Sequence, residues 1–203
     1  MNETTRTLEN LELVGGALCL DFVNTINSRL HTEHDYLLQY SDLVGWANKV
    51  GILSTVQTNQ LLKRAKQPSK EADHALKTSR ALRDLIYTIL SKTAKGSEPN
   101  QEDLEFLLQM YAEAISHAVF LKEGNHYTTT WKADQSFDGM LWPVVHSAGE
   151  LLLSGELGKV KECPGCGWLF LDTSKNQSRR WCSMNTCGAR DKMRRYHKRQ
   201  RSR

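Results

Sequence analysis

Four cysteines toward the C-terminal end constrain this chain more than any other feature. They lie in the run CPGCGWLFLDTSKNQSRRWCSMNTC, in which two residues separate the first pair, fifteen separate the two pairs and four separate the second pair. Each short pair can bring two sulfurs to one ion, and the gap is long enough for a small hairpin between the pairs. The spacing predicts one structural zinc ion, with no coordination position left for a reactive water, bound by Cys163, Cys166, Cys182 and Cys187.

The residues around the first pair suit a metal-binding turn. Gly165 and Gly167 permit tight backbone geometry, so that amide N–H groups can point at the sulfurs. Trp168 and Phe170 alternate with leucines, as in a short strand, and can supply the small apolar core that the metal alone does not. A redox Cys-x-x-Cys pair is the alternative, but it leaves the second pair unexplained and lacks a strand-helix-strand context.

Charge is divided unevenly along the chain. Residues 159–203 hold 13 Lys+Arg against 3 Asp+Glu, a net charge of +10, whereas residues 1–158 carry a net charge of −6. Such asymmetry suggests a polyanion partner for the basic end, although a solvated basic terminus produces the same pattern. Basic residues close to the cysteines can also offset the negative charge of a zinc ion with four thiolates: Lys161, Arg179, Arg180 and Arg190.

A basic helix is predicted to follow the last cysteine. No proline interrupts the sequence after Cys187, and its residues favour a helix. A basic helix projecting from a zinc core is a common reader of nucleic acid. Arg190, next to the metal, is the candidate for reading a base edge, whereas Met193 and Tyr196 are expected to dock on the zinc core. The predicted DNA contacts are Arg179, Arg180, Arg190, Lys192, Arg194, Arg195, Lys198 and Arg199.

The preceding part of the chain has the apolar periodicity of helices. Residues Leu18, Phe22, Ile26 and Leu30 recur every four positions, as on one helix face. The other helices are expected over 41–50 with Ser41 as N-cap, 55–66, 70–90, 101–115 after a cap at Asn100, and from 141 to a stop at Gly155. Within 101–115, five residues are expected to face inward: Leu104, Leu107, Leu108, Tyr111 and Ile115.

Between the last two of these helices the pattern changes to that of a hairpin. Gly124-Asn125 separates two runs rich in β-branched and aromatic residues, 119–121 and 127–131. The fold class is therefore mainly α. We expect a helical N-terminal domain with a small β-hairpin, and a C-terminal four-cysteine zinc finger built from a short hairpin and a helix.

Other candidate sites carry weaker signals. The segment His31–Asp35 holds metal-binding residue types, but it lacks the spacing of a helical metal site and reads as a solvated loop. Asp21, Asn24 and Thr25 can line a pocket, although helix capping and packing explain them equally simply. No nucleophile elbow, phosphate-binding loop or dinucleotide fingerprint is present, so an enzyme is not expected.

Composition also bears on the compartment. The first dozen residues are polar and acidic, unlike a secretory signal. The most apolar segment, 141–153, is too short to span a bilayer and is interrupted by His146 and Glu150. Four of the five cysteines cluster, which differs from a disulfide-stapled secreted fold. We therefore expect a cytoplasmic protein with no membrane partner.

Two segments resemble a known bacterial family. The run CGWLFLDTSKNQSRRWCSMNTCGARDKMRRYHKR resembles the CGNR zinc finger, and GGALCLDFVNT at 15–25 resembles the opening motif of the ABATE-type domain that accompanies it. The resemblance spans nearly the whole chain and implies a stress-induced transcription regulator that binds DNA through the finger. Cys187, Gly188 and Arg190 match the CGNR motif, whereas Ala189 replaces its Asn. Any hydrogen bond from that Asn is missing here, so base preference or the helix start can differ.

These observations divide the chain into a helical regulatory or sensor domain, 1–158, and a zinc finger with its basic helix, 159–203. We expect the first to fold without the second and to bind a small-molecule effector or another protein. The leading hypothesis is a transcription regulator that binds DNA, and we expect a homodimer because one short helix covers a small site. The alternative is a zinc-finger module that binds protein or RNA without sequence-specific DNA binding, which a strict duplex preference would exclude.

Overall fold

The computed structural model describes residues 7–30, 34–65, 69–131 and 136–201. Over these residues the predicted mainly-α fold with two small two-stranded sheets is confirmed. The elements follow in the order α1 (Leu18–Val23), α2 (Tyr40–Lys49), α3 (Thr55–Arg64), α4 (Lys70–Ala94), α5 (Gln101–Ser116), β1 (Ala118–Glu123), β2 (His126–Trp131), α6 (Trp142–Leu153), β3 (Val160–Glu162), β4 (Leu169–Leu171) and α7 (Ala189–Arg201).

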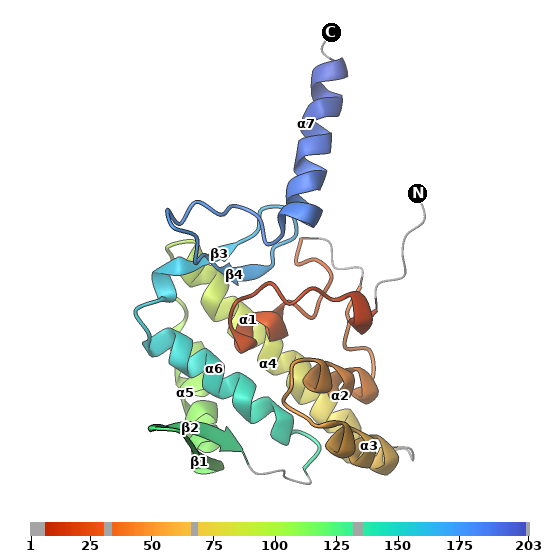
Figure 1. Cartoon of the computed structure of the whole chain (residues 1–203), viewed down its shortest axis with the longest axis vertical. Helices are drawn as coiled ribbons and strands as arrows, with labels where there is room; N and C mark the ends of the chain where they lie inside the picture. Colours follow the sequence, from red (N-terminus) through yellow and green to blue (C-terminus); the bar gives the residue numbers. More distant parts are fainter. Residues whose placement is uncertain (1–6, 31–33, 66–68, 132–135, 202–203) are drawn as a thin grey trace.

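The longest helix, α4, runs through the middle of the body (Figure 1). Its buried residues, which include Ala75, Leu82, Ile86 and Ile89, follow the helical spacing that the sequence predicts, and α1, α2 and α5 pack against it. The helix continues four residues beyond the predicted end at Leu90. Its last turns pack against β3, so a contact from the finger stabilises residues that the local pattern leaves out.

The first helix is shorter than predicted. α1 ends at Val23, and the side chain of Asn24 turns away to pair with the finger. Farther along, Ile26 and Asp35 form an isolated antiparallel bridge, and Leu30 is 51% exposed. The prediction of one helix face through position 30 is therefore wrong. Hydrogen bonds to distant parts of the chain replace the intrahelical bonds there.

Helix starts are set by local capping. At α3, the Ser54 hydroxyl accepts from the amide of Gln57 at 3.3 Å, and the Gln57 side chain accepts from the amide of Ser54 at 2.8 Å. At α2, the N-cap is Gln39 rather than the predicted Ser41. The Asp42 carboxylate accepts a hydrogen bond from the amide of Gln39 at 2.9 Å, and this bond moves the helix start toward the N-terminus.

α5 and the hairpin that follows carry exposed apolar side chains. The hairpin β1–β2 is confirmed, with the turn at Gly124, whose φ is +60°. On α5, Leu107 is buried, but Leu108 and Ile115 are 64% and 40% exposed, so their predicted inward orientation is wrong. α6 covers the side of α5 that carries Tyr111, which packs against Gly149, whereas Leu108 and Ile115 lie outside this contact.

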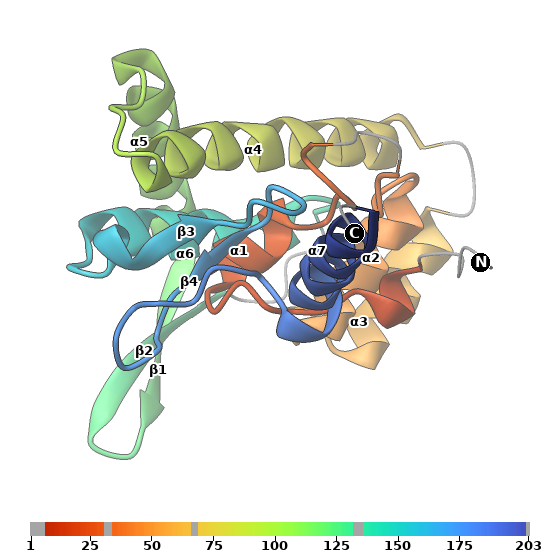
Figure 2. The same ribbon diagram turned by 90° about the horizontal axis from the view of Figure 1, so that it is seen from above.

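The cysteine-rich segment lies across α1 and the C-terminal end of α4, and α7 projects away from it (Figure 1). The view from above shows α7 end-on over this segment, with the β1–β2 hairpin extending in a different direction (Figure 2). None of the helices in the described ranges combines the length and apolarity that a membrane span needs. The basic helix is thus presented to solvent at one end of the molecule.

Candidate metal centre and nucleic-acid interface

The four cysteines predicted as metal ligands meet in one place. Their sulfur atoms lie within 4.8 Å of one another, and all four side chains are buried. Cys182 Sγ lies 3.5 Å from Cys166 Sγ and 3.7 Å from Cys187 Sγ. A disulfide holds its sulfurs about 2.05 Å apart, so these are free thiols. Tetrahedral zinc with Zn–S bonds of about 2.3 Å separates its sulfurs by about 3.8 Å.

The chemistry of these donors fits a divalent cation. The pKa of Cys163 is lowered by hydrogen bonds from the other three thiols, first that of Cys166. The pKa of Cys166 is raised by its own hydrogen bonds with Cys163, Cys182 and Cys187, and by burial. Protons are therefore retained within the metal-free cluster, and a bound cation releases them and takes all four sulfurs as thiolates. The site fits one structural zinc ion.

The first cysteine pair lies at the tip of a hairpin. β3 pairs antiparallel with β4, with Lys161 opposite Phe170. The strands thus flank Cys163 and Cys166, and the hairpin does not lie between the two pairs as the gap suggested. The amide of Gly167 donates to the carbonyl of Cys163 at 2.8 Å, and its φ of +75° requires glycine.

The second cysteine pair leads directly into α7. Cys187 belongs to a π-helical turn, Met184–Gly188, and α7 begins at Ala189. A Cβ atom at Gly165 in the first knuckle would lie only 3.3 Å from Cys187 Sγ, so the two knuckles approach closely. Because Cys187 is both a ligand and part of this turn, the metal fixes the position from which the basic helix starts.

Aromatic side chains fill the interior of the finger, as predicted. Phe170 is fully buried, and Trp168 and Trp181 are nearly so. The Arg179 guanidinium lies 4.4 Å from the centre of the Phe170 ring and donates to the carbonyls of Trp181, at 3.0 Å, and Cys182. The Arg179 side chain therefore forms part of the finger's own framework.

Sequence reasoning missed Asp172, which organises the loop between the two pairs. Its carboxylate is fully buried and accepts from Lys161 Nζ at 2.6 Å, the Ser174 hydroxyl at 2.6 Å and the Arg179 amide at 2.9 Å. Lys161 is thus paired with Asp172, whereas the sequence suggested that it offsets the thiolates. An aspartate followed by Thr-Ser at a strand end is typical of an Asx turn, and this signal could have identified the residue.

Asn24 links the body to the strand β4 of the finger. Its Nδ2 donates to the carbonyl of Leu169 at 2.8 Å, and its Oδ1 accepts from the amide of Leu169 at 3.0 Å. Two residues farther along β4, the amide of Leu171 donates to the carbonyl of Gly15 at 2.8 Å. Asn24 is 1% exposed, so its side chain extends the backbone hydrogen bonding of a short strand inside the protein.

A zinc ligand itself is hydrogen bonded to the body. The carbonyl of Cys166 accepts from the amide of Arg29 at 2.8 Å and from the hydroxyl of Ser28 at 3.2 Å. Beside it, the indole of Trp168 donates to the carbonyl of Ile26 at 2.7 Å. The body segment 24–29 therefore runs beside the first knuckle and is hydrogen bonded to it at several positions.

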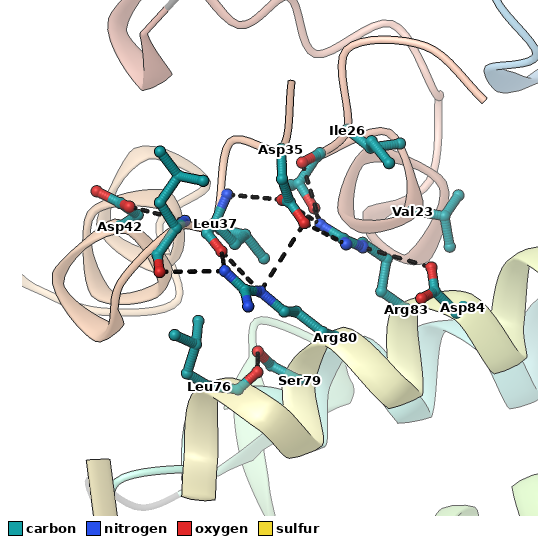
Figure 3. Close-up of polar contacts among 12 residues, drawn as sticks. Val23, Ile26, Asp35, Leu37, Asp42, Leu76, Ser79, Arg80, Arg83 and Asp84 are labelled. Atoms are coloured by element: carbon teal, nitrogen blue, oxygen red, sulfur yellow. Dashed lines mark hydrogen bonds and ion pairs between the residues drawn. The ribbon is translucent and has the colours of Figure 1, made fainter. Parts of the chain in front are cut away.

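Helix α4 binds the part of the body that follows segment 24–29, around Asp35 and Leu37 (Figure 3). Arg83, whose side chain is 3% exposed, donates to both carboxylate oxygens of Asp35 at 2.6 Å and to the carbonyl of Thr25 at 3.2 Å. Arg80 donates to the carbonyl of Leu37 at 2.8 Å. Burial raises the pKa of Asp35, but the hydrogen bonds and charge of Arg83 outweigh it, so the pKa is lowered overall.

The weaker candidates from the sequence have structural roles. Asp21 accepts from the amide of Gly15 at 2.8 Å, while Asn24 and Thr25 take part in the contacts described above. These three side chains therefore satisfy backbone and side-chain groups, and the capping and packing explanation holds. Of the segment His31–Asp35, positions 31–33 lie outside the described residues, and its aspartate is paired with α4.

The basic residues predicted to contact DNA are placed in different ways. Arg179 is half-buried within the finger, and the exposed Arg180 lies with its guanidinium 4.9 Å from the centre of the Trp181 ring. The others are exposed on α7, the helix that projects into solvent in Figure 1: Arg190, Lys192, Arg194, Arg195, Lys198 and Arg199.

One acidic residue accompanies these cations on α7. Asp191, 6% exposed, accepts from Arg194 Nη2 and Arg195 Nε, each at 2.6 Å. Its pKa is lowered by these partners, Arg195 first. Met193 and Tyr196 are 56% and 57% exposed, so the prediction that they dock on the zinc core is wrong. The finger's aromatic residues already fill that core.

Comparison with known families gives two matches that divide the chain. A family described as "CGNR zinc finger" matches residues 159–200. A family described as "ABATE: Putative stress-induced transcription regulator" matches residues 16–155, which is more than half of the chain. No curated protein matches the chain. The gap between the two matches falls just before β3, at the start of the segment that carries the cysteines.

Proposed function

We propose that this chain binds duplex DNA through its CGNR zinc finger and α7. The chain belongs to the ABATE family of stress-induced transcription regulators, and this membership supports the proposal. The observation that carries the proposal is an exposed helix of 13 residues, rich in arginine and lysine, whose first turn follows a zinc ligand. The metal centre gives the helix a fixed origin, and its charge gives it affinity for phosphates.

Within this proposal, the basic residues divide into phosphate contacts and one base contact. Lys192, Arg194, Arg195, Lys198 and Arg199 lie along the exposed helix and can each neutralise a phosphate, as can Arg180 beside the finger. Arg190 occupies the first turn, where the neighbouring ligand Cys187 restricts its backbone. A positioned arginine can hydrogen bond to the O6 and N7 atoms of guanine. The half-buried Arg179 contributes mainly by shaping the finger.

Selection of duplexes from a random pool, with the zinc-loaded full chain, tests this proposal. Recovery of a preferred sequence supports it, and the length and symmetry of that sequence indicate whether one chain or a homodimer binds. The logarithm of affinity should fall with the logarithm of salt concentration at a slope near about −5 if about six phosphates are neutralised. Absence of duplex binding at low salt would instead favour a protein- or RNA-binding module.

Matched single substitutions assign the contacts. Lys198→Ala should weaken binding to all duplexes alike and reduce the salt slope by about one unit. Arg190→Ala should cost roughly 1–3 kcal/mol and relax the preference at one base pair. Lys77 is exposed on α4, away from the finger, so Lys77→Ala should change neither quantity.

We propose an effector-binding role for the body. A cavity of about 260 Å³ lies between the α2–α3 connection, β2 and the start of α6. Its lining combines apolar residues such as Ile52, Leu61 and Met140 with the polar residues Gln57 and Thr129. A small metabolite that binds there should raise the melting temperature of the full chain, and Leu61→Trp should abolish that shift by filling the cavity. A broad screen without a shift would favour protein contact as the role of the body.

A further inference from the structure

The helix α7 carries an apolar stripe that is not used inside the protein. The apolar residues Ala189, Met193 and Tyr196 and, at the end of the stripe, the polar Gln200 are spaced four, three and four residues apart, so they lie on one helix face. All four are exposed, with Met193 and Tyr196 at 56% and 57%. The buried Asp191 lies on the opposite face of the helix. The stripe therefore points away from the rest of the chain.

Basic residues border the stripe on both sides. The helical spacing places two rows beside it, one composed of Arg190, Arg194, His197 and Arg201, and the other of Lys192, Arg195 and Arg199. A single row of cations would suit a helix that lies along one phosphate backbone. Two rows with an apolar strip between them match a surface that has negative charge on both walls and a less charged floor.

The charge of α7 decides between the partners that an exposed apolar stripe can have. The helix holds seven Lys+Arg and one Asp, a net charge of +6 with His neutral. Pairing with α7 of a second copy would bring two such helices together, and like charges at that distance oppose it. The major groove of B-DNA is about 12 Å wide, admits an α-helix, and has phosphates along both walls. On its floor the thymine C5-methyl groups are the apolar features.

We infer that α7 lies in the major groove with its stripe against the base edges, and that Met193 and Tyr196 recognise thymine methyl groups. The inference rests on the proposed DNA binding and adds a base preference to it. The two basic rows hold the phosphate walls, and Gln200 at the end of the stripe can donate to and accept from adenine. The stripe makes this finger a reader of A·T pairs, with Arg190 reading a guanine near the start of the helix.

Replacement of thymine by uracil tests the inference, because it removes the methyl group and leaves the phosphates and base pairing unchanged. The zinc-loaded full chain is titrated with a duplex of alternating adenine and thymine and with the same duplex containing deoxyuridine. Each methyl group that the stripe buries should give about fourfold tighter binding to the thymine duplex. Two contacts should therefore give about tenfold or more.

Variants assign the discrimination to the stripe. Alanine is a strong helix former, so Met193→Ala and Tyr196→Ala keep α7 helical. Each should reduce the thymine-to-uracil ratio about fourfold, and the double variant should bring it to one. Arg199→Ala, from one of the two basic rows, should weaken binding to both duplexes and leave the ratio unchanged.

The outcomes separate the two proposals. Equal binding of the two duplexes by the wild-type chain would overturn the inference and leave DNA binding intact. A ratio that persists in the double variant would overturn the assignment to Met193 and Tyr196. If the chain bound neither of these duplexes and no duplex from the random pool at low salt, the proposed function itself would be overturned.

Discussion

Single side chains carry the connection between the two parts of this chain. Asn24 pairs with both backbone groups of Leu169, while Arg83 holds Asp35 and Thr25 on the other side of the same segment. Each is a buried polar group whose hydrogen-bond partners here come from distant parts of the chain, which makes it costly to replace. The predictions that follow use this dependence.

Asn24→Ala should destabilise the whole chain. The substitution leaves the amide and carbonyl of Leu169 without partners inside the protein, and two such groups together cost about 2–4 kcal/mol. Urea unfolding of the zinc-loaded protein measures this loss. Thr58→Val is the matched control, because the buried Thr58 hydroxyl has no hydrogen-bond partner among the described residues and its loss should be nearly neutral. Equal stability of the two variants would contradict the role of Asn24.

The Asp35–Arg83 pair should make stability sensitive to acid. The pKa of Asp35 is lowered in the folded chain, so below pH about 5 the unfolded chain takes up the proton first. Stability contributed by the pair is present near neutrality and is lost as the pH falls through about 4 and below. Asp35→Asn should flatten this dependence in unfolding curves recorded between pH 3 and 6.

At neutral pH, the loss of stability in Asp35→Asn can be compared with that in Asp84→Asn. Asp35→Asn removes the carboxylate that binds the buried Arg83 at 2.6 Å, leaving Asp84 at 3.7 Å from Arg83 Nε, and should cost about 3 kcal/mol. Asp84→Asn removes a carboxylate that is 57% exposed and pairs with Arg29 at 2.6 Å and with Arg83 only at 3.7 Å, so it should cost less than about 1 kcal/mol. A similar loss in both variants would argue against a special role for the buried pair.

Asp191→Asn should strengthen DNA binding and weaken discrimination. The substitution removes one negative charge and releases Arg194 and Arg195, which the carboxylate now holds. We expect tighter binding to every duplex and a salt slope steeper by about one unit, measured by titration across salt concentrations. Glu113→Gln, an exposed change on α5, controls for net charge alone and should leave the slope as it is.

At the scale of elements, the sequence predicts what local interactions determine. The spacing of apolar residues locates α4 and α6, the helix expected over 55–66 is found as α3, and the Gly-Asn turn gives the β1–β2 hairpin. The prediction fails for α1, which ends early because Asn24 and its neighbours bond to a finger far along the chain. No periodicity within one segment reveals such a partner.

For the candidate site, too, the sequence predicts the local features and not the contacts between distant segments. Ligand spacing identifies the four cysteines, because both members of each pair are close in the sequence. It does not reveal that β3, which precedes the first ligand, pairs with β4, or that Arg179 turns inward. The exposed positions of Met193 and Tyr196 were also missed, because the finger core is filled by aromatic residues from two separate stretches, Trp168 with Phe170 and Trp181.

For the molecule as a whole, removal of the metal should destabilise the helical body. Removal of zinc by a chelator should lower the melting temperature of the helical signal by about 5 °C or more, since several interface hydrogen bonds of about 1 kcal/mol each depend on the first knuckle. Far-UV circular dichroism of the full chain measures it. Cys166→Ser should remove this dependence on zinc, whereas Cys19→Ala, which changes a buried cysteine outside the cluster, should retain it.

This expectation refines the proposed division at residue 158. A chain that ends there should still fold, because the contacts among α1, α4 and α6 do not involve the finger. Its melting temperature should nevertheless be lower than that of the zinc-loaded full chain. An unchanged melting temperature on truncation or zinc removal would mean that the finger is only tethered to the body.

The pairing of Asn24 with Leu169 joins residues that are 145 positions apart. At the ribosome, a chain grows by about 5–20 residues per second, so Asn24 waits about 7–30 s before its partner has been made. During that time the segment 24–29 has no finger to follow, and the surface that will meet β4 is open to water and to other chains. We expect the supply of zinc, at the moment when the last cysteine emerges, to set how long this surface of a newly made molecule stays exposed.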